Sequence, residues 1–302
     1  MRTGAWILMI GGLALAGCGG DEGAELSDKT IEQNDALADN PAVRGRDIDR
    51  RIFEQKLELA RTERLDTLPF GAMIVRIGES FLGTRYTPGT LEAEGPEHLV
   101  INLEELDCVT YIENVLALAR IVRAGEPTWP AFVKELERIR YRDGELDGYA
   151  SRLHYFSEWI SDNESLGLMR NITRDLGGVR LTEAIDFMST HADLYRQLAD
   201  SATLAQIREM EARLNEQERW YIPEGDLSEA VSRLENGDII AATSAIDGLD
   251  VAHTGFAVRR RDGVYLMHAP LVGKDVQLSE TPIDQRIRRI EAQDGIMVAR
   301  PL

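Results

Sequence analysis

The stretch Leu106-Asp107-Cys108-Val109-Thr110-Tyr111-Ile112-Glu113 places an aspartate directly before a cysteine at the start of an apolar helical pattern. Aspartate is a good helix N-cap, and the free N–H groups and peptide dipoles of a helix N-terminus lower the pKa of a thiol placed there. The second cysteine, Cys18, ends an apolar leader, so Cys108 has no evident disulfide partner. Cys108 is therefore a candidate nucleophile, with an intermolecular bridge or a buried inert thiol as alternatives.

The pattern around this stretch predicts an α+β fold. We expect helices in the first part, a helical insertion of mixed pattern over about 130–236, and antiparallel strands after it. The expected helices cover residues 49–62, 71–82, 107–123, 190–219 and 227–234. A short apolar strand is expected over 238–242, followed by a hairpin around Arg261-Asp262-Gly263-Val264.

The hairpin brings two histidines, His253 and His268, to one face of the predicted sheet. With a two-residue loop at Asp262-Gly263, or with a four-residue loop, the two histidines miss direct cross-strand pairing by an even number of residues. Both side chains then lie on the face of the sheet opposite the apolar residues, whereas a three-residue loop would place them on different faces. The pair could be metal ligands, a surface coincidence, hydrogen-bonded structural residues, or a base and its orienter. A metal site needs three or four ligands. Together with a helix-terminal thiol, base and orienter is the most economical combination.

The first residues predict export. Residues 1–17 have a short basic start, an apolar stretch and small residues at the end, as secretory signals do. Leu15-Ala16-Gly17-Cys18 resembles a bacterial lipobox, which implies lipidation of Cys18; ordinary secretion is the alternative. Residues 18–45 are polar and acidic and predict a flexible tether. We expect a lipid-anchored protein of the bacterial cell envelope, in the outer membrane and facing the periplasm, since no aspartate follows Cys18.

Composition limits the partners. The formal net charge of −18 argues against nucleic acid and against broad contact with anionic lipid, since both need clustered Lys and Arg. We expect most of this charge to lie on solvated helix faces. Residues 46–302 are long enough for one large domain or two small ones, and we expect a single domain. The only expected contact with a membrane is the N-terminal lipid.

Four motifs occur in the order found in NlpC-type papain-like cell-wall hydrolases: Leu82-Gly83-Thr84-Arg85-Tyr86, Leu106-Asp107-Cys108-Val109-Thr110, Asp250-Val251-Ala252-His253-Thr254-Gly255-Phe256 and Met267-His268-Ala269. The chain most resembles the branch formerly catalogued as a domain of unknown function and now regarded as N-acetylmuramoyl-L-alanine amidases. Arg152-Leu153-His154-Tyr155 and Asp175-Leu176-Gly177-Gly178 add to this resemblance. Val109-Thr110 replaces the Ser-Gly of the broader group, which puts that group's usual cleavage after D-glutamate in doubt.

The resemblance implies roles for individual residues. Cys108 would be the nucleophile, His253 the general base and acid, and His268 the orienting residue. The Cys108 N–H and the Tyr86 hydroxyl would stabilise the oxyanion, and no metal or organic cofactor would be needed. The implied substrate is peptidoglycan or a muropeptide, cut between N-acetylmuramic acid and L-alanine.

Residues that contact the substrate are harder to assign. Arg85 and Arg152 are candidates for binding stem-peptide carboxylates, although a surface ion pair is the more common role for such an arginine. His154 and Tyr155 are candidates for pocket lining, whereas Trp159 is expected in the core. Asp107 is expected to cap its helix and is also a candidate near the oxyanion. Asp162-Asn163 could end a helix, form a turn or contact a sugar.

Two other functions remain compatible with the sequence. The same thiol chemistry could serve a stem-peptide endopeptidase or an acyltransferase that uses an amine in place of water. Alternatively, the chain could be an inactive lipid-anchored binding protein, with the expected helix over 190–219 as a partner surface. The presence of Cys108 together with both histidines favours an active hydrolase.

Overall fold

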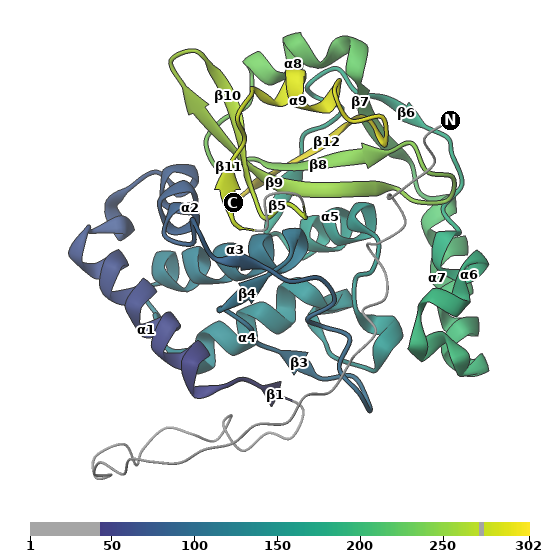
Figure 1. Ribbon diagram of the computed structural model, residues 1–302, viewed down its shortest axis with the longest axis horizontal. Helices are drawn as coiled ribbons and strands as arrows, with labels where there is room; N and C mark the ends of the chain where they lie inside the picture. Colours follow the sequence, from purple (N-terminus) through teal and green to yellow (C-terminus); the bar gives the residue numbers. More distant parts are fainter. Residues whose placement is uncertain (1–42, 272–274) are drawn as a thin grey trace.

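The computed structural model describes residues 43–271 and 275–302 as an α+β fold in layers. In Figure 1, α2, α3 and α5 lie below a twisted sheet, and α8 and α9 lie above it. The predicted signal sequence, the lipidation residue Cys18 and nearly all of the predicted tether lie outside the described residues. Within the described ranges, no helix is long and apolar enough to cross a membrane.

Five helices form the lower layer and its side: α1 (Asp47–Thr62), α2 (Phe70–Glu79), α3 (Cys108–Ala124), α4 (Trp129–Arg140) and α5 (Phe156–Ser165). Helix α3 is the centre of this layer. Its residues are buried almost throughout, because α2 and α4 pack against it on two sides and β9 on a third. Gly125 ends the helix with a φ of 74°, a left-handed conformation that glycine adopts without strain.

The main sheet has eight strands in the order β11-β10-β9-β8-β12-β7-β6, with β5 paired to β12. The strands are β5 (Met169–Asn171), β6 (Val179–Leu181), β7 (Arg219–Pro223), β8 (Ile239–Ser244), β9 (Val251–Arg260), β10 (Gly263–His268), β11 (Gln277–Leu278) and β12 (Gln293–Pro301). All of these pairs are antiparallel. The strand β12 lies between β8 and β7 and joins the two halves of the sheet.

The β9–β10 hairpin places both histidines on one face, as predicted, but its loop lies one residue earlier than predicted. Gly263 pairs with Arg260, so the two-residue loop is Arg261-Asp262 and not Asp262-Gly263. In this register, His253 and His268 share a face with Ala257 and Leu266, while Phe256 and Met267 point to the other face. The second set packs with the lower helices, including Tyr111 of α3 at a ring distance of 5.8 Å.

The face of the sheet that carries His253, His268, Ala257 and Leu266 lies against α8 and α9. Ala257 and Leu266 pack with Ile283 and Ile287 of α9 (Ile283–Ile287), and α8 (Leu227–Ser232) covers the same face. Both histidines therefore point towards the side of the sheet that carries α9. The sheet therefore lies between the helical layer of α3 and the layer of α9.

The predicted long helix over 190–219 is wrong. The structure has a short helix α6 (Phe187–Thr190), two 3-10 turns, a helix α7 (Ser201–Glu216) and then β7. Asp200 begins α7 by accepting a hydrogen bond from the Thr203 N–H at 2.9 Å. The capping aspartate therefore starts the helix later than its charge pattern suggested.

Two other expectations for the middle of the chain need correction. The region 130–236 is not only helical, because it contributes β5, β6 and β7 to the main sheet. Asp162 and Asn163 lie inside α5 and do not end it. Asn163 is buried and donates to the carbonyls of Ile139 and Trp159, so it ties α5 to α4.

Candidate active site

Cys108 is the first residue of α3, and Asp107 caps the helix as predicted. The Asp107 carboxylate accepts the N–H groups of Val109 at 3.1 Å and Thr110 at 2.8 Å. In return, the Thr110 hydroxyl accepts the N–H of Asp107 at 2.9 Å. This reciprocal arrangement fixes the first turn and holds Cys108 at the end of the helix where N–H groups are free.

Thr254 brings the sheet to the sulfur. The β9–β10 pairing ends at Phe256 and Met267, and His268 pairs with Gln277 of β11 instead. Near that point, the backbone N–H of Thr254 lies close enough to the Cys108 sulfur to lower the pKa of the thiol. Cys108 therefore lies where β10 leaves β9, at the junction of the helical layer and the sheet.

The predicted low pKa of Cys108 is not what the enclosed site produces. Burial raises the pKa of the thiol to about 12, and the Asp107 carboxylate acts in the same direction. The N–H groups of Thr254, Cys108 and Val109 lower the pKa, but by less. The sequence-based expectation counted the helix N-terminus and left out desolvation, which disfavours a buried thiolate. In this structure the resting group is a neutral thiol.

His253 and His268 are in direct contact. Nε2 of His253 lies 2.6 Å from Nδ1 of His268, and the rings are nearly perpendicular at 81°. Both side chains are buried. Burial lowers the pKa of His253 well below its usual range and the pKa of His268 to about 3, and the nearby positive charge of Arg286 adds to both. The pair is therefore neutral at physiological pH, with one ring donating to the other.

The contact uses Nε2 of His253 and leaves its Nδ1 for another partner. Among the described residues, no hydrogen bond joins His253 to Cys108 in this structure. A thiol and base that form their hydrogen bond only with substrate present would behave in this way. In this structure His253 is therefore joined to His268 and not to the thiol.

Tyr86 reaches the same place from a separate small sheet. Strand β2 (Arg85–Tyr86) pairs in parallel with β4 (Glu105–Leu106), so that Tyr86 lies beside Leu106, two residues before the cysteine. Burial raises the pKa of Tyr86, and the proximity of Cys108 raises it further. The phenol therefore stays protonated and can donate a hydrogen bond near the sulfur.

The two predicted substrate arginines already have partners. Arg152 is buried and forms ion pairs with Glu92 and, at 3.5 Å, with Glu97. Arg85 is exposed and lies 3.5 Å from Glu105. The rings of His154 and Tyr149 lie 4.4 Å apart and are tilted by 42°, and His154 contacts the Tyr149 carbonyl through Nε2 at 2.8 Å. Their roles towards a substrate remain predictions.

A family comparison gives these positions a context. A family model described as N-acetylmuramoyl-L-alanine amidase-like (AmiA-like) matches residues 76–296, which include Tyr86, Cys108, His253 and His268.

The chain belongs to the N-acetylmuramoyl-L-alanine amidase-like family.

Solved structures agree with this membership. An N-acetylmuramoyl-L-alanine amidase from Bacteroides uniformis is 36% identical, with a TM-score of 0.71 over 77% of this chain and 99% of its own. A Bacteroides fragilis protein that carries a provisional xylanase name is 37% identical, with a TM-score of 0.69 over 74% and 98%. A Legionella pneumophila protein assigned to the DUF1460 family model shares the fold at 23% identity, with a TM-score of 0.65 over 84% and 96%. None of the curated proteins compared matches the chain.

A residue that the sequence analysis did not single out, Arg286, adds a positive charge to this amidase-like site. Arg286 of α9 is half-buried and lies close enough to Cys108, His253 and His268 for their charges to interact. Helix α9 has only five residues, and no motif marks its arginine. Only the packing of α9 on the histidine face of the sheet places Arg286 there.

The buried histidine pair of the amidase-like protein predicts a pH-dependent stability. The pKa of His268 is lower in the folded protein than in the unfolded chain. Below pH ~6.5 the unfolded chain therefore binds a proton that the folded protein does not, and the free energy of unfolding decreases as the pH is lowered. The contribution of His268 is about 1.4 kcal/mol per pH unit below that value. Urea unfolding should show that lowering the pH from 7 to 5 destabilises His268→Gln by about 2 kcal/mol less than it destabilises the unaltered protein. The exposed His191→Gln is the matched control, and an unchanged difference in His268→Gln would contradict the prediction.

Proposed function

We propose that this protein is a cysteine amidase that hydrolyses the bond between N-acetylmuramic acid and L-alanine in peptidoglycan or muropeptides. The observation that carries the proposal is the 2.6 Å contact between His253 and His268, with Thr254, the residue after His253, acting through its backbone on Cys108 at a helix N-terminus. Family membership supports the class of bond. The helices followed by an antiparallel sheet would suit a papain-like fold, in which a helix would carry the nucleophile and a sheet the base.

His253 would activate the thiol. With Nε2–H of His253 donating to Nδ1 of His268, the neutral His253 has an unprotonated Nδ1 that can accept the Cys108 proton. The proton moves to His253 as the sulfur attacks the lactyl carbonyl carbon, so the buried thiolate need not exist free. This order fits a thiol whose pKa is raised by burial.

The tetrahedral oxyanion would form at the N-terminus of α3. The Cys108 N–H is one donor, and the Tyr86 hydroxyl is a candidate for the second. His253 then gives its proton to the L-alanine nitrogen as the carbon–nitrogen bond breaks, which releases the peptide and leaves a thioester on Cys108. Water, deprotonated by His253, attacks the thioester and restores the thiol and the neutral imidazole.

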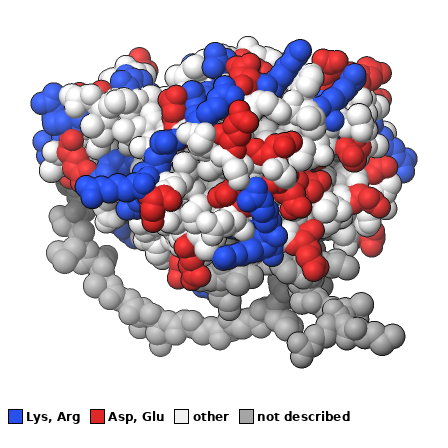
Figure 2. Space-filling view, turned by 90° about the horizontal axis from the view of Figure 1, so that it is seen from above, with Lys and Arg blue, Asp and Glu red and all other residues white. Residues whose placement is uncertain are grey.

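We also propose that the protein works at the cell envelope. Residues 1–17 would direct export, lipidated Cys18 would anchor the chain, and the following residues would act as a tether. An outer-membrane anchor facing the periplasm would bring the domain to the cell wall. The face in Figure 2 supports a soluble body on such a tether, because acidic and basic side chains are interspersed over it.

Mass spectrometry of defined N-acetylmuramoyl peptides tests the bond. After incubation with the purified protein, we expect a free muramic acid derivative and an intact peptide beginning with L-alanine. Fragments cut inside the peptide would replace the assignment with an endopeptidase, and transfer to an added amine would indicate an acyltransferase. Absence of any cleavage by folded protein would favour the binding-protein alternative.

A further inference from the structure

Arg286 is half-buried and has no acidic partner among the described residues, a feature that it shares with the buried Arg219. Nη1 of Arg286 donates to Oε1 of Gln293 at 3.2 Å, and no Asp or Glu oxygen among the described residues lies within ion-pair distance. By contrast, the buried Arg140 and Arg152 are paired with glutamates. A half-buried guanidinium has lost part of its hydration, and without a counter-ion nothing compensates this loss.

The position of Arg286 follows from the packing of α9. Ile283 and Ile287 bury the helix against the face of the sheet that carries His253 and His268. Arg286, between these two contacts in sequence, sends its charge towards the same face, where it disfavours protonation of both histidines. A negative charge on Cys108 would raise the pKa of Arg286, so the guanidinium lies within electrostatic range of the sulfur.

The remaining donors of Arg286 are available to a ligand. The structure gives Nε and Nη2 no acceptor among the described residues, and neither is among the fully buried atoms that lack partners. Planar arginine groups bind carboxylates through two parallel hydrogen bonds. The neutral histidines beside it offer no competing negative charge, so an anion is the ligand that this arrangement fits.

We propose that Arg286 binds a carboxylate of the substrate's stem peptide and thereby selects substrates whose second residue has a free α-carboxylate. This inference rests on the proposed amidase function. In a stem peptide whose second residue, D-glutamate, is linked through its side chain, that carboxylate is the first negative charge on the leaving-group side. Two residues of chain span at most ~7 Å, so the group stays close to the bond being cut.

The test compares two muropeptides that differ only in the second residue, one with a free α-carboxylate and one with the α-carboxamide. The protein should have a kcat/KM about 10- to 100-fold higher for the free acid, the range expected for a hydrogen-bonded charged group. In Arg286→Gln, the ratio of kcat/KM for the free acid to kcat/KM for the carboxamide should fall to about one, whatever the variant does to the rate on the carboxamide. Arg288→Gln is the matched control, because Arg288 is exposed and already lies near Asp284 at 3.5 Å.

Two outcomes would overturn the assignment. Equal loss on both substrates in Arg286→Gln would mean that Arg286 acts only on the thiol and histidines. Equal rates of the unaltered protein on both substrates would mean that the carboxylate is not recognised.

A binding measurement separates this inference from the proposed function. If no muropeptide is cleaved, the proposed function fails, and calorimetry with L-alanyl-γ-D-glutamate and its α-carboxamide then decides on Arg286. Cys108→Ala protein should prefer the free acid by the same factor, and Cys108→Ala/Arg286→Gln should lose that preference. Equal affinities of both proteins for the free acid would overturn the inference.

Discussion

Replacing Cys108 with alanine is expected to reduce muropeptide hydrolysis by at least about 10⁴-fold, because the thioester can form on no other atom of the proposed site. The described part of the chain has a single cysteine, Cys108, so no second thiol there can substitute. Product formation followed by mass spectrometry gives the rate. A loss of this size would identify the nucleophile, since removal of a residue that only binds substrate costs far less.

The fold should survive the same substitution. Alanine favours helix, and the cap that starts α3 is made by Asp107 and Thr110, which remain. The unfolding midpoint in urea should therefore stay close to that of the unaltered protein. Cys108→Ser tests the chemistry separately, because it keeps the size of the side chain and offers a much poorer nucleophile. Full activity in either variant would exclude Cys108 as the attacking group.

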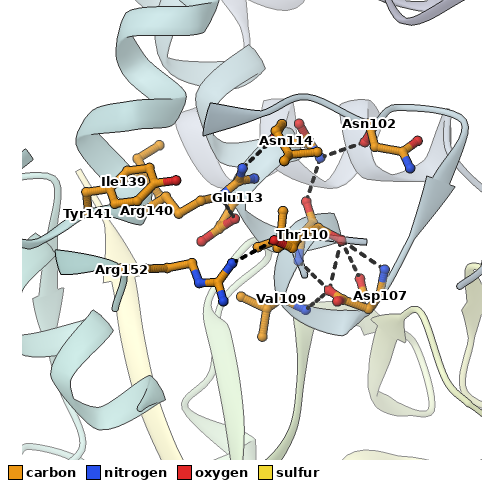
Figure 3. A network of polar contacts seen from close by, with 12 residues as sticks. Asn102, Asp107, Val109, Thr110, Glu113, Asn114, Ile139, Arg140, Tyr141 and Arg152 are labelled. Atoms are coloured by element: carbon orange, nitrogen blue, oxygen red, sulfur yellow. Dashed lines mark hydrogen bonds and ion pairs between the residues drawn. The ribbon is translucent and has the colours of Figure 1, made fainter. Parts of the chain in front are cut away.

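Replacing Arg140 with methionine is expected to lower the free energy of unfolding by about 3–5 kcal/mol, because it leaves a buried carboxylate without its partner. Nε of Arg140 lies 2.7 Å from Oε2 of Glu113, and both side chains are almost fully buried. Figure 3 shows this pair beside α3, with Asn114 and the Asp107 cap on the same helix. Chemical unfolding at neutral pH measures the loss.

The double variant Glu113→Leu/Arg140→Met is the decisive control. With both charges removed, no uncompensated group remains, so the double variant should be more stable than Arg140→Met alone. The gain would show that the loss comes from the isolated carboxylate and not from the missing volume of the arginine. Equal stability of the single and double variants would contradict this account.

The parts of the fold that depend on local chemistry could be predicted from the sequence. Asp107 caps α3 because a short acceptor side chain before a helix satisfies free N–H groups wherever that helix lies. The common face of His253 and His268 follows from the two-residue period of a strand and a hairpin with an even offset. Neither inference needs knowledge of distant residues.

The parts that depend on distant packing could not be predicted. Charged residues over 190–219 suggested one long helix, yet Asp200 begins α7 and the residues after Glu216 turn into β7, which finds its partners in β6 and β12. Short strands such as β5 and β6 carry too few residues for a pattern. Their pairing is fixed by β12 and β7, which lie far along the chain.

The catalytic roles of Cys108, His253 and Tyr86 remain predictions. The structure places Thr254, the residue after His253, near Cys108, and it pairs Tyr86 with Leu106, two residues before the cysteine. The raised pKa of Cys108 and the presence of Arg286 could not be inferred, because both follow from how much solvent the packed layers exclude. Burial is a property of the assembled fold.

The central place of β12 determines when this sheet can form. The strands β8 to β11 form one group and β6 with β7 another, and only β12 hydrogen-bonds to both, as well as to β5. Until residues 293–301 insert, the facing edges of β8 and β7 remain open, and open strand edges are prone to pairing with other chains. Contacts of such long sequence separation also slow folding. A newly made chain is therefore expected to be most prone to aggregation and proteolysis until β12 has inserted between β8 and β7.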